Sequence, residues 1–186
     1  MKHRELYRKL VPKNAYIITY SDLAICKTNK SAKRIAQSIY YPLGSEYSNE
    51  RMDLGIRAHK IKEAEEGDWI NELKLSYKMS NKYYLCGTID RYYTLTKVIE
   101  DFKTTGKPAS DYLKSKQVET YAFIAMNNDL LVNKGRYTTI DFEGRVLDQE
   151  MVEINEEIIA NCYDTFILPR FNMIKEEIKK LRNQFK

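Results

Sequence analysis

KYYLCGTIDRYYTLTKVIEDFK, residues 82–103, is the stretch of sequence that decides the fold. Aromatic and β-branched residues dominate it, and these residue types favour β-strands. The stretch predicts two strands, over residues 82–93 and 95–103, joined by a turn. Just before it, ELKLSYKM at residues 72–79 alternates between apolar and polar residues, which is the pattern of a third strand.

The segments on either side of these strands return to helical spacing. Residues 52–66 predict a helix that ends at Gly67, and residues 113–127 predict another. RYTTIDF at 136–142 predicts a further strand, and helix is expected from about Gln149 to the end, with an interruption at Pro169. The first 45 residues are expected to be helical or irregular, with Ser21 capping a short helix that begins near Asp22.

This order of elements predicts an α/β fold with a central mixed sheet flanked by helices. The length of 186 residues fits a single domain. Within it we expect an N-terminal helical segment at 1–50, a core at 51–145 and a C-terminal helical region at 149–186.

One apolar stripe follows the C-terminal helix. Its members recur at helical spacing: Phe171, Ile174, Ile178, Leu181 and Phe185. Such a stripe either docks the helix against the core of its own chain or forms the seam of a homo-oligomer.

The composition excludes several classes of protein. No apolar run approaches the roughly 18 residues of a membrane span, and the charged N-terminus lacks the apolar region of a signal peptide. We therefore expect no membrane partner. The net charge of +5 is compatible with a polyanionic partner but is too mild to demonstrate one.

Cysteine and histidine usage limits the metal chemistry. Cys26, Cys86 and Cys162 are odd in number and far apart, which argues against a disulfide framework or a four-cysteine zinc site and favours a reducing, cytoplasmic interior. Of the two histidines, only His59 is a plausible catalytic imidazole. The glycines are isolated, so a nucleotide-cradling loop has no basis in the sequence.

The predicted strands carry a set of charges suited to hydrolysis. Asp101 and Lys103 lie two apart on a strand and therefore project from the same face. Asp90, near the end of the preceding strand, comes alongside them if the two strands pair as a hairpin. Two carboxylates can hold a divalent cation, and an ammonium can position water or phosphate, so the set suits metal-assisted hydrolysis of a phosphodiester.

The acidic-x-Lys triplet alone is weak evidence. Glu72–Lys74 and Glu177–Lys179 have the same spacing, but the first lacks a preceding acidic strand residue and the second lies on the exposed face of a helix. Asp90 by itself could equally be an ordinary strand-end residue near a turn.

Five segments in order resemble the RecB-type branch of the PD-(D/E)XK nucleases, including the small RecB-like exonucleases associated with CRISPR loci. YSDLAIC (20–26) is similar to the opening segment of that branch, and GIRAH (55–59) resembles its G-x-x-x-H helix. GTIDRY (87–92) and VIEDFKTT (98–105) resemble its two active-site strands, and QVETY (117–121) its Q-x-x-x-Y helix. The resemblance implies a restriction-endonuclease-like PD-(D/E)XK core.

The resemblance also implies roles for individual residues. His59, Asp90 and Asp101 would bind Mg²⁺ or Mn²⁺ together with the backbone carbonyl of Phe102, and Lys103 would position the attacking water or the phosphate. Gln117 and Tyr121, one helical turn apart, would contact DNA or orient Lys103. Without that context His59 would read as an ordinary partly buried histidine, Gln117 as a surface residue and Tyr121 as a core-edge tyrosine.

Three lysines lie between the active strand and the Q-x-x-x-Y helix. They are Lys107, Lys114 and Lys116, and they read either as phosphate contacts or as a solvated loop.

The chain departs from many members of the branch at the iron–sulfur cluster. Four thiolate ligands cannot be assembled from its three scattered cysteines, so no cluster is expected.

The function expected from these features is metal-dependent hydrolysis of DNA, at single strands or ends, by exonuclease or endonuclease action. Two alternatives remain open. One is a catalytically idle nucleic-acid-binding or complex-forming module on the same fold. The other is a structure-selective endonuclease.

Overall fold

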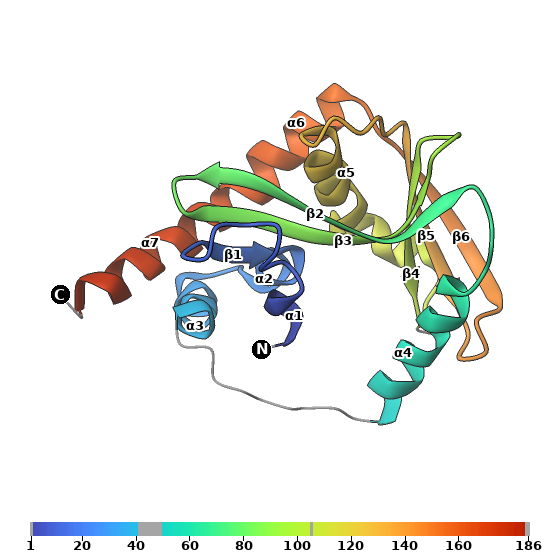
Figure 1. The fold of residues 1–186 in the computed structure, drawn as a ribbon, viewed down its shortest axis with the longest axis horizontal. Helices are drawn as coiled ribbons and strands as arrows, with labels where there is room; N and C mark the ends of the chain where they lie inside the picture. Colours follow the sequence, from blue (N-terminus) through green and yellow to red (C-terminus); the bar gives the residue numbers. More distant parts are fainter. Residues whose placement is uncertain (1, 41–49, 105, 185–186) are drawn as a thin grey trace. The chain divides into compact units, whose positions relative to one another are not determined.

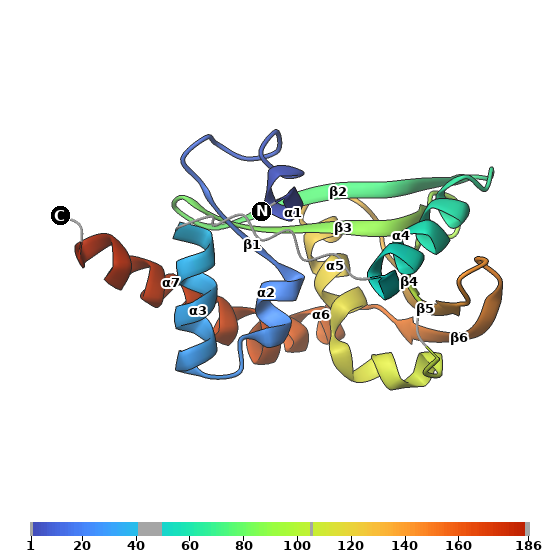
Figure 2. The ribbon, with the colours of Figure 1, turned by 90° about the horizontal axis from the view of Figure 1, so that it is seen from below.

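The computed structural model describes residues 2–40, 50–104 and 106–184 and divides the chain into two compact units. The first unit contains Met1–Ser45, Lys74–Gly87 and Ala160–Lys186, and the second contains Glu46–Leu73 and Thr88–Ile159. The elements of each unit are labelled in Figures 1 and 2.

The first unit holds the N-terminal elements and the C-terminal helix. Its elements are α1 (Lys2–Glu5), β1 (Tyr16–Thr19), α2 (Tyr20–Ile25), α3 (Asn29–Tyr40), the π-helical turn η2 (Tyr163–Ile167) and α7 (Leu168–Gln184). The turn between β2 (Trp69–Ser80) and β3 (Tyr83–Tyr93) also belongs to it. Tyr7, Val11, Ala15, Ile17 and Cys86 form one hydrophobic core of this unit.

The second unit holds the remaining strands and helices. Its elements are α4 (Glu50–Glu63), β4 (Val98–Lys103), the 3₁₀ helix η1 (Ala109–Ser115), α5 (Gln117–Met126), β5 (Lys134–Ile140), β6 (Val146–Glu153) and most of α6 (Glu156–Cys162). The far ends of β2 and β3 lie here as well.

The strands follow the order β1-β3-β4-β5-β6, and β2 pairs with β3. β1 with β3 and β4 with β5 are parallel pairs, whereas β3 with β4 and β5 with β6 are antiparallel. A mixed sheet flanked by helices was the fold predicted from the sequence, and the structure confirms it.

Three local predictions were wrong. The first 45 residues were expected to be helical or irregular, but Tyr16–Thr19 forms strand β1, which pairs with β3. Residues 149–153 are not helical but belong to strand β6, and helix begins at Glu156. Thr19 rather than Ser21 caps α2, because its side chain accepts the Asp22 N–H while the Asp22 carboxylate accepts the Thr19 N–H. The interruption expected at Pro169 lies just before it, because the π-helical turn η2 separates α6 from α7; Pro169 itself lies in the first turn of α7, where a missing N–H is tolerated.

The C-terminal stripe docks within its own unit. Phe171, Ile174, Ile178 and Leu181 are buried, and α7 packs along α3. Phe185 lies outside the described residues. In the described part of the chain, no helix combines the length and the apolar character needed to cross a bilayer.

Two glycines let the helices of the second unit approach its strands closely. A Cβ on Gly135 of β5 would meet the Val118 side chain of α5 at 2.8 Å. A Cβ on Gly55 of α4 would meet Thr104 Oγ1, just after β4, at 2.8 Å. Because glycine has no Cβ, Gly135 and Gly55 allow α5 and α4 to pack against the strands that carry the candidate site.

Candidate active site

Asp90 lies where β3 and β4 stop pairing. Paired residues of these strands run from Tyr93 opposite Val98 to Arg91 opposite Glu100. The next N–H along β4, that of Phe102, donates to Asp90 Oδ2 at 2.8 Å. A side-chain carboxylate thus replaces a backbone acceptor of the strand pair. This bond fixes Asp90 beside the Asp101–Phe102 peptide, as expected for two strands that pair as a hairpin.

Asp101, Lys103 and Gln117 form a closed ring of polar contacts. Lys103 Nζ lies 2.5 Å from Asp101 Oδ2 and donates to Gln117 Oε1 at 2.7 Å. Gln117 Nε2 donates to Asp101 Oδ1 at 2.6 Å and to the Tyr121 hydroxyl at 3.1 Å. The amide of α5 therefore holds the carboxylate and the ammonium of β4 in one fixed arrangement.

The charge of Asp101 and burial both disfavour the charged form of Asp90. The pKa of Asp90 is raised well above its usual value, first by burial and then by the negative charge of Asp101. The Phe102 N–H and the Lys103 ammonium act in the opposite direction without cancelling the effect. Two carboxylates therefore share this point with the single ammonium of Lys103.

His59 of α4 reaches the same point. Its Nδ1 lies 3.8 Å from Asp90 Oδ2, and its ring meets the Phe102 ring edge-on with centroids 6.1 Å apart. Burial is the largest influence on the His59 pKa and lowers it, against the nearby charge of Asp101. The imidazole is therefore neutral at pH 7, the form in which histidine binds metals.

Arg91 anchors the end of the helix that carries His59. Its guanidinium is buried between the Trp69 and Phe102 rings, 4.4 and 5.1 Å from their centroids. It donates to the Lys62 carbonyl in the last turn of α4 and to Glu65 Oε2 at 3.1 Å. Sequence reasoning missed this residue, although a charge directly after Asp90 in an apolar strand was a usable signal.

Tyr137 fixes the start of the helix that carries Gln117. Its buried hydroxyl accepts the Gln117 N–H at 3.1 Å and the Val118 N–H at 3.2 Å, two donors that the first turn of a helix leaves unpaired. Tyr137 is also the β5 residue paired with Asp101. Sequence reasoning missed it, and no local signal distinguished it from the other tyrosines.

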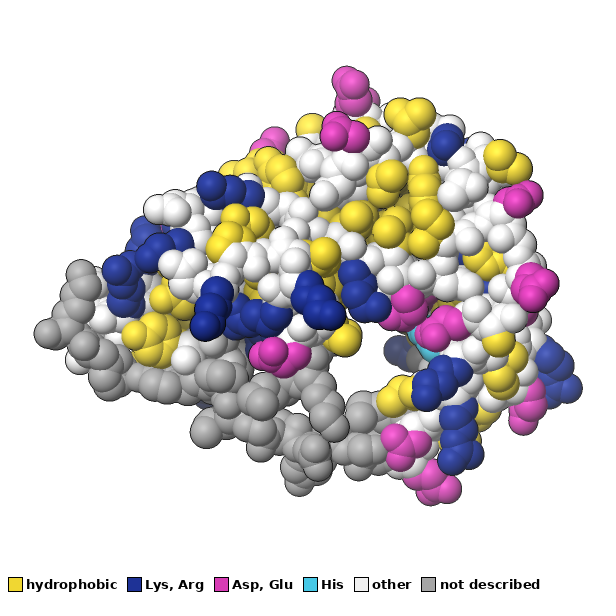
Figure 3. Space-filling view, viewed as in Figure 1, with side chains coloured by type: hydrophobic (Ala, Val, Ile, Leu, Met, Phe, Trp, Pro, Cys, Tyr) yellow, Lys and Arg dark blue, Asp and Glu magenta, His cyan; other side chains and the backbone are white. Residues whose placement is uncertain are grey.

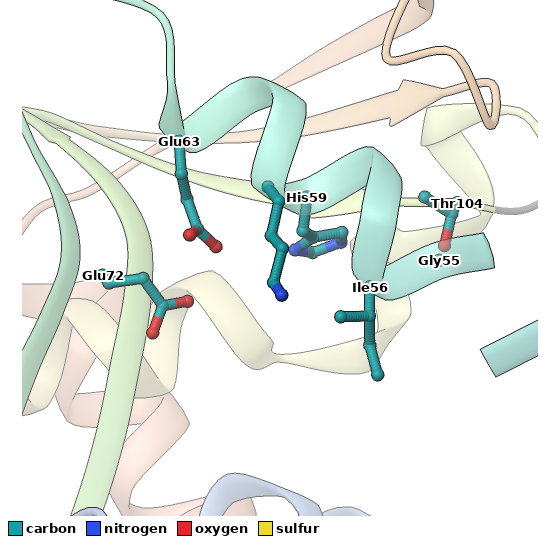
Figure 4. Close-up of a pocket in the computed structure, with 7 residues that line it drawn as sticks. Gly55, Ile56, His59, Glu63, Glu72 and Thr104 are labelled. Atoms are coloured by element: carbon teal, nitrogen blue, oxygen red, sulfur yellow. The ribbon is translucent and has the colours of Figure 1, made fainter. Parts of the chain in front are cut away.

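A pocket of about 380 Å³ opens beside His59. Gly55, His59, Glu63, Glu72 and Thr104 are among its lining residues (Figure 4). The charge of Glu72 raises the pKa of both His59 and Asp90. The Glu72–Lys74 triplet was noticed in the sequence and set aside, so Glu72 is a further acidic residue of this region that the sequence argument missed.

The three predicted lysines are placed differently. Lys107 and Lys114 are exposed on the segment that leads from β4 to α5. Lys116 is bound to the buried carboxylate of Glu119, with Nζ 3.0 Å from Oε1. Phosphate contact by these lysines remains a prediction.

The donor atoms fit a hard divalent cation. Asp101 Oδ2 is buried and accepts no hydrogen bond from the described residues, although the Lys103 ammonium is beside it. Among the described residues, no three His, Cys, Asp or Glu side chains are grouped closely enough to hold a metal by themselves. Mg²⁺ does not require such a cage, because it keeps several waters and uses one or two carboxylates together with substrate phosphate.

Known proteins match this chain in fold. No protein-family model and no curated protein matches its sequence. A phage-related exonuclease from Haemophilus somnus 129PT matches with a TM-score of 0.61, at 12% identity over 96% of this chain and 99% of its own. The alkaline exonuclease LHK-Exo from Laribacter hongkongensis matches with a TM-score of 0.59, at 14% identity over 92% of this chain and 94% of its own.

A second structure of LHK-Exo, in complex with dAMP, matches with a TM-score of 0.58, at 17% identity over 90% of this chain and 92% of its own. At such low identities the similarity establishes a shared fold. This chain therefore has the mixed sheet and flanking helices found in these exonucleases.

Proposed function

We propose that this protein is a divalent-metal-dependent deoxyribonuclease that acts on single-stranded DNA or DNA ends. The observation that carries the proposal is the ring of Asp101, Lys103 and Gln117 beside Asp90. This set of charges suits phosphodiester hydrolysis, and it sits on a fold shared with exonucleases.

Four groups of the second unit would hold the metal. They are the carboxylates of Asp90 and Asp101, the Phe102 backbone carbonyl and the neutral imidazole of His59. A bound Mg²⁺ or Mn²⁺ supplies positive charge to the phosphate oxygens and lowers the pKa of a coordinated water. The two carboxylates and the carbonyl are oxygen donors of the kind that these ions prefer.

Lys103 would act on the substrate directly. Its ammonium is held by Asp101 and Gln117 and can neutralise a phosphate oxygen or orient the attacking water. Gln117 orients both partners, because it accepts from the Lys103 ammonium and donates to the Asp101 carboxylate. The Tyr121 hydroxyl, one turn further along α5, accepts a hydrogen bond from the Gln117 amide and so helps to orient it.

Two features support action on DNA ends or single strands. The matched proteins are exonucleases, and one of their structures contains dAMP. The five segments that resemble the RecB-type branch include every residue of the proposed site. We assign the chain to that branch as part of the proposal.

The idle-module alternative fits the electrostatics less well. Asp90 and Asp101 repel each other, and the raised pKa of Asp90 reflects this unfavourable arrangement. A protein that only binds nucleic acid has no use for a buried carboxylate pair beside a lysine. A site that binds a cation does.

The test is a cleavage assay on end-labelled DNA, single- and double-stranded, linear and circular, with Mg²⁺, Mn²⁺ or EDTA. We expect metal-dependent cleavage of linear single strands and no cleavage in EDTA. Cutting of circular DNA would assign endonuclease action. Failure to cut any substrate in either metal would favour the idle module.

A further inference from the structure

The two units carry opposite charge. The first contains 18 Lys and Arg against five Asp and Glu, a net charge of +13. The second contains 13 Lys and Arg against 21 Asp and Glu, a net charge of −8. The overall value of +5 conceals this separation, which is large enough to direct a polyanion to one unit.

Helix α3 presents its cations in an arrangement that costs stability. Its buried face is formed by Ala32, Ile35 and Ala36, and its exposed residues include Lys30, Lys33 and Arg34. Lys30 lies in the first turn, where the helix dipole disfavours positive charge, and no acidic residue is present there. Its spacings of three and four to Lys33 and Arg34 place like charges side by side.

The same unit carries further exposed cations. Lys9, Lys13 and Lys27 come from the N-terminal segments, Lys78 from β2 and Lys82 from the turn that follows it. Figure 3 shows Lys and Arg side chains gathered over the elements of this unit, with few acidic ones among them. Folding gives no reason for such an excess, whereas binding a polyanion does.

The candidate active site lies in the acidic unit. Asp90, Asp101, His59 and Lys103 all belong to this second unit, in which Asp and Glu outnumber Lys and Arg. A net charge of −8 repels a phosphate backbone, so this unit is poorly suited to provide affinity for DNA in the absence of a cation. We therefore expect the affinity for DNA to come from the first unit and the cleavage chemistry from the second.

We propose that the first unit binds DNA through its phosphate backbone, with Lys30, Lys33 and Arg34 of α3 as central contacts. The inference rests on the proposed function for the identity of the polyanion. Contacts of this kind read no sequence; they supply affinity that falls as salt rises. Binding does not need the divalent metal, because the contacts lie outside the metal-binding residues.

The test compares two charge-matched triple variants by fluorescence anisotropy with labelled single-stranded DNA in EDTA. In one, Lys30, Lys33 and Arg34 are replaced by Gln. In the control, Arg57, Lys134 and Arg145 of the second unit, all exposed, are replaced by Gln. Titrations are repeated over a range of KCl concentrations, and thermal melts check that both variants fold.

We expect the α3 variant to bind about tenfold more weakly at ~0.1 M salt, with a log–log salt slope shallower by about 2. The control should change the affinity less than twofold, and the Tm of the α3 variant should be unchanged or higher. Equal affinities of the two variants would overturn the inference. Wild-type binding to phosphatidylserine vesicles, without loss of DNA affinity in the α3 variant, would assign the face to a membrane instead.

These results are separable from those that test the proposed function. A protein that binds DNA through α3 but cleaves nothing in Mg²⁺ or Mn²⁺ would retain the inference and lose the nuclease. A protein that cleaves DNA but binds it equally well without the α3 cations would retain the nuclease and lose the inference.

Discussion

Asp90 and Asp101 carry the same charge in different surroundings. Asp101 has the Lys103 ammonium 2.5 Å away and accepts a hydrogen bond from Gln117. Asp90 accepts the Phe102 N–H, and its pKa is raised by burial and by the charge of Asp101. Without metal, the charge on Asp90 is therefore the less favourable of the two.

This difference gives a prediction for two matched variants in EDTA. Asp90→Asn keeps an oxygen for the Phe102 N–H and removes the repulsion, so we expect an unchanged or higher Tm than wild type at pH 7. Asp101→Asn leaves Lys103 without its counter-charge, and we expect it to cost about 1–3 kcal/mol. Thermal melts of the two proteins in one buffer make the measurement.

The sign of the pH dependence provides a control. A carboxyl whose pKa is raised by folding stabilises the folded state when protonated, and this contribution is lost as pH rises through the raised value. Any gain from Asp90→Asn should therefore disappear as pH falls towards about 4, where the unfolded carboxyl is protonated as well. A strongly destabilised Asp90→Asn at pH 7 would contradict the description of Asp90.

At the scale of elements, the site depends on how α5 is held against β5. The Tyr137 hydroxyl accepts two N–H groups at the start of α5, and this helix carries Gln117. Side chains that cap a helix in this way typically contribute about 1 kcal/mol. The same contact orients the ring of Asp101, Lys103 and Gln117, so it has a consequence beyond stability.

Tyr137→Phe is expected to lower stability by about 1 kcal/mol and to lower the cleavage rate as well. The matched control is Tyr92→Phe, because the Tyr92 hydroxyl likewise bonds to the backbone, donating to the Leu131 carbonyl at 2.9 Å, away from the site. We expect the control to lose similar stability and to keep its cleavage rate. Equal rates for both variants would limit Tyr137 to a structural role.

Residue type predicted the strands at 82–103, whose aromatic and β-branched residues favour β-strands and are buried along most of their length. The projection of Asp101 and Lys103 from one face follows from the two-residue repeat of a strand. The strand at 72–79 was predicted from its alternation of apolar and polar residues. Strand β6 was missed because VLDQEMVE is exposed along most of its length and so lacks that alternation. Arg91 and Tyr137 were missed because their roles depend on contacts with residues far away in the chain, such as Glu65 and Val118.

At the scale of the whole molecule, charge separates the two proposed tasks. The basic unit is assembled from three separate stretches of sequence, so the net charge of the whole chain does not reveal it. The acidic unit holds the carboxylates expected to bind a cation. On this account, DNA affinity in EDTA belongs to the first unit and cleavage to the second.

The central claim is that Asp101 and Lys103 hydrolyse DNA with a divalent metal. The most direct measurement is the single-turnover rate for end-labelled single-stranded DNA in Mn²⁺, for wild type, Asp101→Asn and Lys103→Met purified in the same way. We expect cleavage by wild type that EDTA abolishes. Both variants should lose about 10³-fold or more, equivalent to about 4 kcal/mol, and retain DNA affinity in EDTA. Wild-type rates in either folded variant, or wild-type cleavage that persists in EDTA, would contradict the claim.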